Sequence, residues 1–162
     1  MATDYSYRVP GYVAAAQEMG AGPLNYGGHN FADVNGFREA YGVTFYLKGG
    51  QGDWFHFAIP ITANIDTTIP NLTAVGLLFH TDFPVALEEL TVWDGKNQIW
   101  AQQLGVSGDQ TNTWQVGINL WSIGAPGPHY ILTSLGFSVQ VVAPAGDATV
   151  GFVCARADVT YQ

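Results

Sequence analysis

Charged residues are scarce in this chain, and basic ones are the scarcest. They make up 11% of the 162 residues, less than half of the roughly 25% found in ordinary soluble domains. Thirteen acidic residues against five Lys and Arg give a formal net charge of −8, and the five bases are scattered singly. Without a basic stripe to neutralise phosphates, neither nucleic acid nor an anionic membrane surface is expected as a partner.

Cysteine and long apolar runs are also missing. Cys154 is the only cysteine, so no internal disulfide can form, and its apolar neighbours predict a small buried side chain. No apolar run approaches the roughly 20 residues that a membrane-spanning helix needs. The first five residues lack the positive and apolar segments of a secretory signal. We therefore expect a soluble, cytoplasmic protein, with secretion by another route left open.

Hydrophobic residues, aromatic residues and glycine are abundant instead. They amount to 48% hydrophobic, 14% aromatic and 20 glycines, a composition typical of short β-strands joined by tight turns. The length fits one domain, residues 1–162, that is large enough to bury a core. Residues 1–35 are rich in Gly, Asn and Ala and predict a loop-rich segment, in which only 11–19 favours a strand or a short helix.

Alternation of apolar and polar residues predicts a chain of antiparallel strands. Asp94-Gly95 between two apolar runs indicates a β-hairpin with a type I′ turn, and Pro60 predicts a strand end at a sheet edge or a bulge. No helix is predicted to cross between strands, so we expect an all-β antiparallel sandwich, jelly-roll-like, with eight to nine strands. The predicted strands cover residues 43–48, 54–61, 72–80, 90–93, 98–101, 113–120, 135–143 and 148–158.

Four short segments in fixed order carry a family resemblance. They are Trp54 to Pro60 (WFHFAIP), Val92 to Gly95 (VWDG), Leu104 to Asp109 (LGVSGD) and Leu135 to Val139 (LGFSV). The segments are similar to a family of uncharacterised bacterial β-sandwich proteins, a domain of unknown function, over about residues 43–142. The resemblance implies a compact β-sandwich and supplies no activity or substrate.

Sequence signatures of catalysis are missing. The chain has no G-x-S-x-G elbow, no Ser-x-x-Lys pair and no activated cysteine. Glu88 and Glu89 are adjacent, so on a strand they face opposite ways and cannot flank one glycosidic bond. These absences favour a non-enzymatic function.

Metal-binding patterns are weak. His56 and His80 are the closest pair of histidines, 24 positions apart, and His80 precedes Asp82 at a spacing that suits one strand face. We treat these three as alternative metal ligands only, for a metal-dependent jelly-roll enzyme. Calcium is a second alternative if the loops that carry Asp94, Asn97, Asp109 and Asn112 meet. The main expectation is that no cofactor is bound.

Aromatic and amide residues gather near predicted turns. Sugar rings stack their apolar faces on indole rings while Asp, Asn and Gln bond the hydroxyls, so this pattern predicts lectin-like recognition of a carbohydrate or a similar polar ligand. The competing interpretation is that such tryptophans fill the core or pair across strands. The predicted ligand-binding residues are Trp93, Asp94, Asn97, Trp100, Asn112 and Trp114.

Self-assembly is the leading alternative function. Because few residues are charged, much of the surface is expected to be uncharged, which predicts a homo-oligomer. In this alternative to ligand binding, the chain is a structural protein that forms a homo-oligomer or filament with no small ligand. The edge strands near Pro60 or at the C-terminal strand are the predicted places where a strand of another copy would be added.

Overall fold

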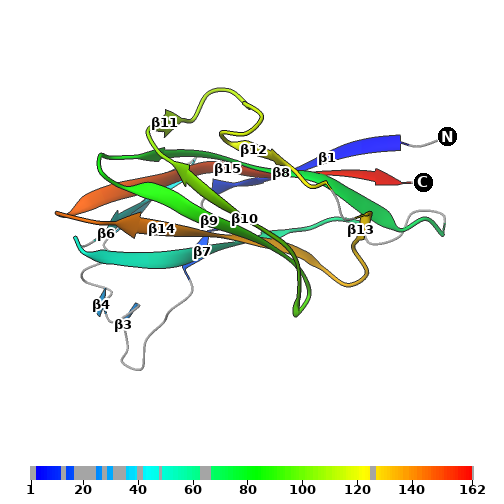
Figure 1. Ribbon diagram of the computed structural model, residues 1–162, viewed down its shortest axis with the longest axis horizontal. Helices are drawn as coiled ribbons and strands as arrows, with labels where there is room; N and C mark the ends of the chain where they lie inside the picture. Colours follow the sequence, from blue (N-terminus) through cyan, green and yellow to red (C-terminus); the bar gives the residue numbers. More distant parts are fainter. Residues whose placement is uncertain are drawn as a thin grey trace.

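The protein is a sandwich of two antiparallel β-sheets (Figure 1). The computed structural model describes residues 3–11, 14–16, 25–26, 29–30, 36–39, 42–47, 49–62, 67–124 and 127–161. Most of the predicted 11–19 element and much of the predicted loop-rich 1–35 segment lie outside these ranges. Among the described residues there is no helix long and apolar enough to cross a membrane.

The described strands fall into long and short ones. Eight strands have six residues or more: β1 (Thr3–Pro10), β6 (Gly42–Leu47), β7 (Gln51–Ile59), β8 (Pro70–Thr81), β9 (Ala86–Asp94), β10 (Asn97–Val106), β14 (Leu135–Ala143) and β15 (Ala148–Tyr161). The short ones are β2 (Ala15–Ala16), β3 (Asn25–Tyr26), β4 (His29–Asn30), β5 (Gly36–Glu39), β11 (Asp109–Gln110), β12 (Leu120–Ser122) and β13 (His129–Tyr130).

Strand pairing confirms the jelly-roll prediction. Sheet A has the order β5-β6-β15-β8, with β11, β12 and β13 along the free side of β8 and β1 beside β15; sheet B has the order β2-β7-β14-β9-β10. Pairs are nested along the chain: β6 with β15, β7 with β14, β8 with β11–β13, and β9 with β10. Successive pairs alternate between the two sheets, which is the topology of a long hairpin rolled into a jelly roll.

Phenylalanines from both sheets form the centre of the core. Phe152 of β15 lies 5.1 Å from Phe55 and 5.2 Å from Phe57 between ring centroids, and Phe57 stacks on Phe137 at 5.0 Å. All four rings are buried. Because side chains alternate along a strand, burying Phe55 and Phe57 turns Trp54 and His56 to the outer face of sheet B.

Several predicted strands are confirmed, and one is wrong. β14 has the predicted limits, β15 begins where predicted, and β7 ends at Ile59, just before Pro60. The predicted strand at 113–120 is wrong: residues 113–119 form a loop with a turn at 117–119, in which buried Asn119 bonds Gln115 N, Gln110 O and Thr113 O. An amide that satisfies backbone groups in this way favours a turn over a strand ladder.

The predicted hairpin exists, but its turn is one residue later. Asn97 pairs with Asp94, so Gly95 and Lys96 are the two turn residues. Gly95 has a φ of 57°, while Thr67 is the only non-glycine among the described residues with positive φ. Positive φ at the first turn residue alone indicates a type II′ turn rather than type I′.

Two features of β1 and β15 depart from the sequence analysis. β1 pairs with β15 over all eight of its residues, from Thr3↔Tyr161 to Pro10↔Cys154, although no strand is predicted there. β15 therefore lies inside sheet A, between β8 and the strands β1 and β6, so the predicted edge at the C-terminal strand is wrong. Cys154 is half-buried, and burial raises the pKa of its thiol.

Gly42 allows close packing where β6 meets β15. A Cβ on Gly42 would lie 2.4 Å from the carbonyl oxygen of Phe152. We expect Gly42→Ala to lower the free energy of unfolding by about 1–3 kcal/mol, because backbone has to shift. Gly124→Ala is the matched control, since its Cβ would meet nothing within 4 Å. Urea unfolding of both variants checks this, and equal midpoints would contradict it.

Candidate functional site

A shallow pocket of about 240 Å³ lies on the outer face of sheet B. Four neighbouring strands, β7, β14, β9 and β10, supply its walls, and two tryptophans stand at its sides. The lining residues are Trp54, His56, Glu89, Thr91, Trp93, Gln98 and Ser138. Aromatic faces beside convergent polar groups make this a binding-site candidate.

Strand register explains why these side chains meet. They form three cross-strand rows on one face, because residues that pair across β7, β14 and β9 point the same way. The rows are Trp54–Gln140–Glu89, His56–Ser138–Thr91 and Ala58–Gly136–Trp93–Gln98. Gly136 leaves a gap beside Trp93, since it has no side chain.

Hydrogen bonds hold the pocket walls in place. Trp93 Nε1 donates to Thr91 Oγ1 at 3.0 Å, which fixes the indole ring across the face. His56 Nδ1 and Ser138 Oγ lie 2.5 Å apart, and Ser138 is buried. These bonds order the pocket before any ligand arrives, which lowers the entropy cost of binding.

Burial lowers the pKa of His56 from its ordinary value of 6.5. Desolvation disfavours the imidazolium form, so His56 is neutral in the folded protein at neutral pH. A neutral imidazole offers one donor and one acceptor. The pocket therefore presents mostly uncharged hydrogen-bonding groups, with the Glu89 carboxylate as the exception among the described lining residues.

The predicted ligand residue Asp94 serves the fold. Its side chain is buried, and its carboxylate accepts hydrogen bonds from the backbone N–H groups of Leu132, Thr133 and Ser134 and from the Thr133 hydroxyl. Burial raises the pKa of Asp94, but these hydrogen bonds outweigh it and lower the pKa below the ordinary value. Asp94 anchors the segment before β14, whereas its neighbour Asn97 is exposed at the start of β10.

Trp100 lies on the other face of the hairpin from Trp93. A β-bulge at Ile99 shifts the register, so Trp100 pairs with the buried Val92 and packs against the core. Trp93 pairs instead with Gln98 on the outer face. The structure therefore separates the two tryptophans that the sequence analysis placed in one site.

Asn112 and Trp114 lie against sheet A, away from the pocket. Asn112 is exposed in the turn region after β11. Trp114 covers Gly76, where a Cβ would lie 2.7 Å from its ring, and the Arg156 guanidinium carbon lies 5.3 Å from its ring centroid. Trp114 thus packs over sheet A and is held by a cation–π contact.

The alternative metal ligands are not brought together. His56 faces outward from sheet B, while His80 belongs to sheet A and lies over Gly151. The Asp82 carboxylate accepts hydrogen bonds from Thr149 N and Oγ1. Among the described residues, no three His, Cys, Asp or Glu side chains gather in a way that would hold a metal ion.

The two loops considered for calcium lie at opposite ends of the sandwich (Figure 1). Asp109 pairs with His80 near the end of β8. Asp94 bonds Leu132, in the segment that follows the pairing of β13 with the start of β8. Asn71, which pairs with Tyr130, and His80 are nine residues apart on β8, so the loops are separated by roughly 30 Å at about 3.3 Å per residue.

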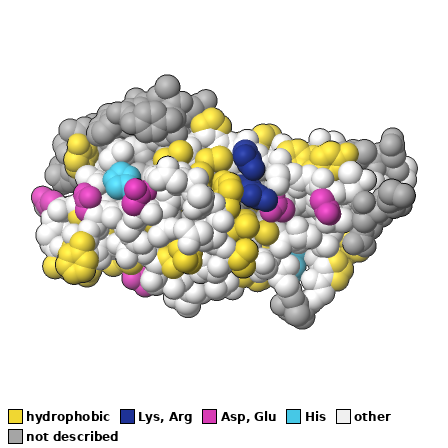
Figure 2. Space-filling view, turned by 90° about the horizontal axis from the view of Figure 1, so that it is seen from above, with side chains coloured by type: hydrophobic (Ala, Val, Ile, Leu, Met, Phe, Trp, Pro, Cys, Tyr) yellow, Lys and Arg dark blue, Asp and Glu magenta, His cyan; other side chains and the backbone are white. Residues whose placement is uncertain are grey.

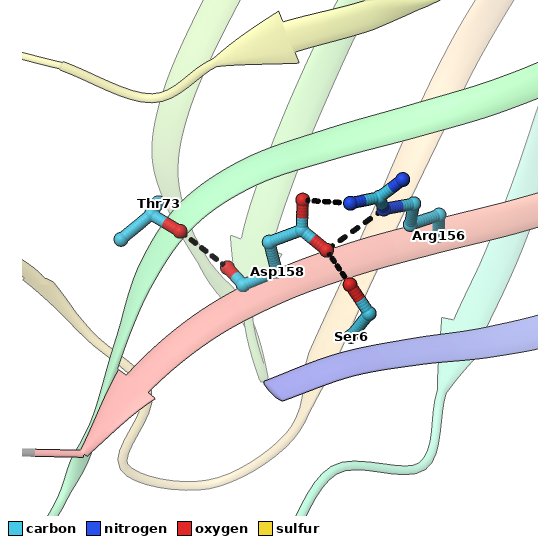
Figure 3. Close-up of polar contacts among 4 residues, drawn as sticks. All are labelled: Ser6, Thr73, Arg156 and Asp158. Carbon is cyan, nitrogen blue, oxygen red and sulfur yellow. Dashed lines mark hydrogen bonds and ion pairs between the residues drawn. The ribbon is translucent and has the colours of Figure 1, made fainter. Parts of the chain in front are cut away.

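A second pocket, of about 470 Å³, lies on the outer face of sheet A over β1, β15 and β8. At its centre, the Asp158 carboxylate accepts two hydrogen bonds from Arg156, at 2.8 and 2.7 Å, and one from Ser6; Thr73 donates to the Asp158 carbonyl (Figure 3). Figure 2 shows the basic and acidic side chains side by side on this face. These polar groups satisfy one another, so they tie three strands together.

Six of the seven described pocket residues are not predicted as ligand-binding residues from the sequence: Trp54, His56, Glu89, Thr91, Gln98 and Ser138. Alternation alone places Trp54 and His56 on the face opposite Phe55. The local pattern does not show the pairing of β14 with both β7 and β9, which places Ser138 beside His56, 82 residues earlier, and beside Thr91, 47 residues earlier.

Comparisons with known proteins add one finding. The chain matches no family model and no curated protein. A search of solved structures finds TmCBM61, a carbohydrate-binding module in complex with beta-1,4-galactotriose, with a TM-score of 0.47, 14% sequence identity and 90% of each chain covered. What that module binds says nothing by itself about this chain.

The role of Asp94 in holding the segment before β14 can be tested by substitution. We expect Asp94→Ala to lower the free energy of unfolding by about 3 kcal/mol, because three backbone N–H groups lose a charged acceptor. Asp109→Ala is the control, since among the described residues that exposed carboxylate accepts hydrogen bonds from Thr111 alone. The Asp94 contribution is present above its ordinary pKa of 3.8 and is lost as pH falls through the lowered folded value. Chemical unfolding at neutral and acid pH measures the free energy of unfolding of both variants and its pH dependence. Equal effects of the two variants would show that Asp94 does not hold the segment before β14.

His56 supplies a pH test. Its folded pKa is below 6.5, so the unfolded chain binds more protons in that range and stability falls as pH is lowered below 6.5. His56→Gln keeps a partner for Ser138 and removes the titration. We expect the thermal midpoint of the native protein to drop more steeply than that of H56Q between pH 6.5 and the acid limit of folding. Parallel curves would show that His56 is not desolvated.

Proposed function

We propose that the outer face of sheet B binds a carbohydrate chain without chemical conversion. The observation that carries the proposal is the pair Trp54 and Trp93, which flank a polar pocket on one face. Indole faces suit the apolar faces of pyranose rings. Gln98, Thr91 and Glu89 supply donors and acceptors that match sugar hydroxyls.

The separation of the two tryptophans favours a chain over a single sugar. Trp54 pairs with Gln140 and Trp93 with Gly136, four residues along β14 and on opposite sides of it. At about 3.4 Å per residue and 4.8 Å per strand, the two backbone positions are roughly 16 Å apart. One pyranose ring is shorter than this span, so we propose an oligosaccharide that contacts both rings.

Binding is favoured over hydrolysis by the carboxylate arrangement. Glycosidases place two carboxylic acids on either side of the scissile bond. Among the described residues that line the pocket, Glu89 is the only acid. Its neighbour Glu88 takes the extra position of a bulge, where Gln140 pairs with Glu89 and Val141 with Leu87, so Glu88 is not part of the pocket rows.

Tryptophan removal tests the site. We expect Trp54→Ala and Trp93→Ala each to weaken binding about thirtyfold, since truncating an aromatic anchor costs about 2 kcal/mol or more. Trp114→Ala and Trp100→Phe are the controls outside the pocket and should keep native affinity. Calorimetry against a panel of neutral oligosaccharides, with β-1,4-galactotriose included, measures this. The proposal would be wrong if no oligosaccharide in the panel gave a heat of binding, or if all four variants lost affinity equally.

Filling the gap beside Trp93 gives a variant that keeps the fold. A Cβ on Gly136 would meet only the Phe57 carbonyl oxygen, at 3.5 Å, so Gly136→Thr suits the strand and should not lower the melting temperature. The added side chain would occupy the pocket next to Trp93. We therefore expect G136T to lose oligosaccharide binding at full stability, and undiminished binding would place the ligand elsewhere.

A further inference from the structure

Edge strands in this fold differ in how they are protected. β1 is a long edge strand that carries Asp4, Arg8 and Pro10, the residue types that block strand addition. Every other described edge strand except β10 has four residues or fewer. Short length and charged or proline residues therefore guard these edges.

β10 has neither short length nor charged or proline residues, and its two β-bulges, which also protect edges, lie on either side of a regular stretch. It is ten residues long, lies at the edge of sheet B and contains neither a charged residue nor a proline. Its middle stretch, Trp100–Gln103, pairs regularly with β9 between two bulges, and Ala101, Gln102 and Gln103 are exposed. Within the part of the chain that the structure describes, no strand pairs with the other side of this stretch, so its backbone N–H and C=O groups there are open to a partner strand.

We propose that β10 pairs antiparallel with β10 of a second copy of this chain, with a two-fold axis near Ala101 and Gln102. A strand paired antiparallel with itself is closed by that axis, so two copies complete the contact. The protein has a net charge of −8, but β10 brings no charge to the seam. Two copies therefore approach there without direct repulsion.

Charges at the strand ends favour the antiparallel orientation. Lys96 precedes β10, and the exposed Asp109 follows the end of β10 by three residues, at the start of β11 in sheet A. Antiparallel pairing brings the Lys96 end of each copy toward the Asp109 end of the other. Parallel pairing would instead put like charges at the same end.

The seam leaves the pocket open. The two-fold axis of an antiparallel pair is perpendicular to the sheet, so both outer faces of sheet B point to the same side. Two pockets then lie on one continuous sheet, each with its Gln98 near the seam. This pairing stands on the edge strand alone and does not depend on carbohydrate binding.

Charge insertion tests the seam. We expect light scattering with size exclusion to give the native protein twice the chain mass, decreasing only on strong dilution. Gln102→Lys and Gln102→Glu should each be monomeric, because like charges meet across the axis, whereas an equal mixture of the two should recover the dimer mass. Asn112→Lys, on the exposed turn over sheet A, is the control and should remain dimeric.

Four outcomes would overturn the proposal. They are a native protein that is monomeric at every concentration, an assembly larger than two copies, a Gln102→Lys variant that stays dimeric, and a mixture of the Lys and Glu variants that fails to dimerise. Thermal melting of each variant checks that the monomer is folded: a single cooperative transition is expected, since Gln102 is exposed and its replacement removes no core contact. A peptide partner instead of a second copy would show as a monomeric native protein.

Discussion

The contact of Phe152 with Phe55 and Phe57 determines how the outer face of sheet B is presented. It joins the middle of sheet A to β7 across the core, and alternation along β7 then fixes Trp54 and His56 outside. Phe137 stacks on Phe57 and sets β14 in the same way, with Ser138 outward. The pocket is thus a consequence of core packing: a one-residue slip in β7 would bury Trp54 and expose Phe55.

Local patterning was sufficient for most of the fold. Strict alternation in 135–143 and 148–158 predicts β14 and most of β15, because each has one buried face. β1 has a weak pattern of Tyr, Ser and Arg, and it becomes a strand because β15 offers it an edge. The loop at 113–119 depends on the three hydrogen bonds of Asn119, which a propensity argument does not include. Contacts with distant parts of the chain therefore determine the structure of both β1 and residues 113–119.

The candidate site was only partly predictable, for reasons of register. Trp93 was assigned to a ligand site and lies in the pocket, whereas the bulge at Ile99 turns Trp100 toward the core. Trp114 has the same polar neighbours in sequence but lies over the other sheet, against Gly76 and Arg156. A tryptophan near a turn is a local feature, but the face it occupies depends on bulges and on long-range pairing.

The pairing of β1 with β15 places the two ends of the described chain side by side, with Thr3 opposite Tyr161 (Figure 1). Ends this close can be joined by a short linker, and the chain can then be reopened at the turn Gly49-Gly50, where, among the described residues, only the hydrogen bonds of Gly49 N to Asp147 and of Gly50 N to Ala143 are at stake. Such a circular permutant would retain every nested strand pair while β6 and β7 lost their direct covalent link. The jelly roll of this protein therefore suits rearranged connectivity, because the loss of stability would be confined to the contacts of one turn.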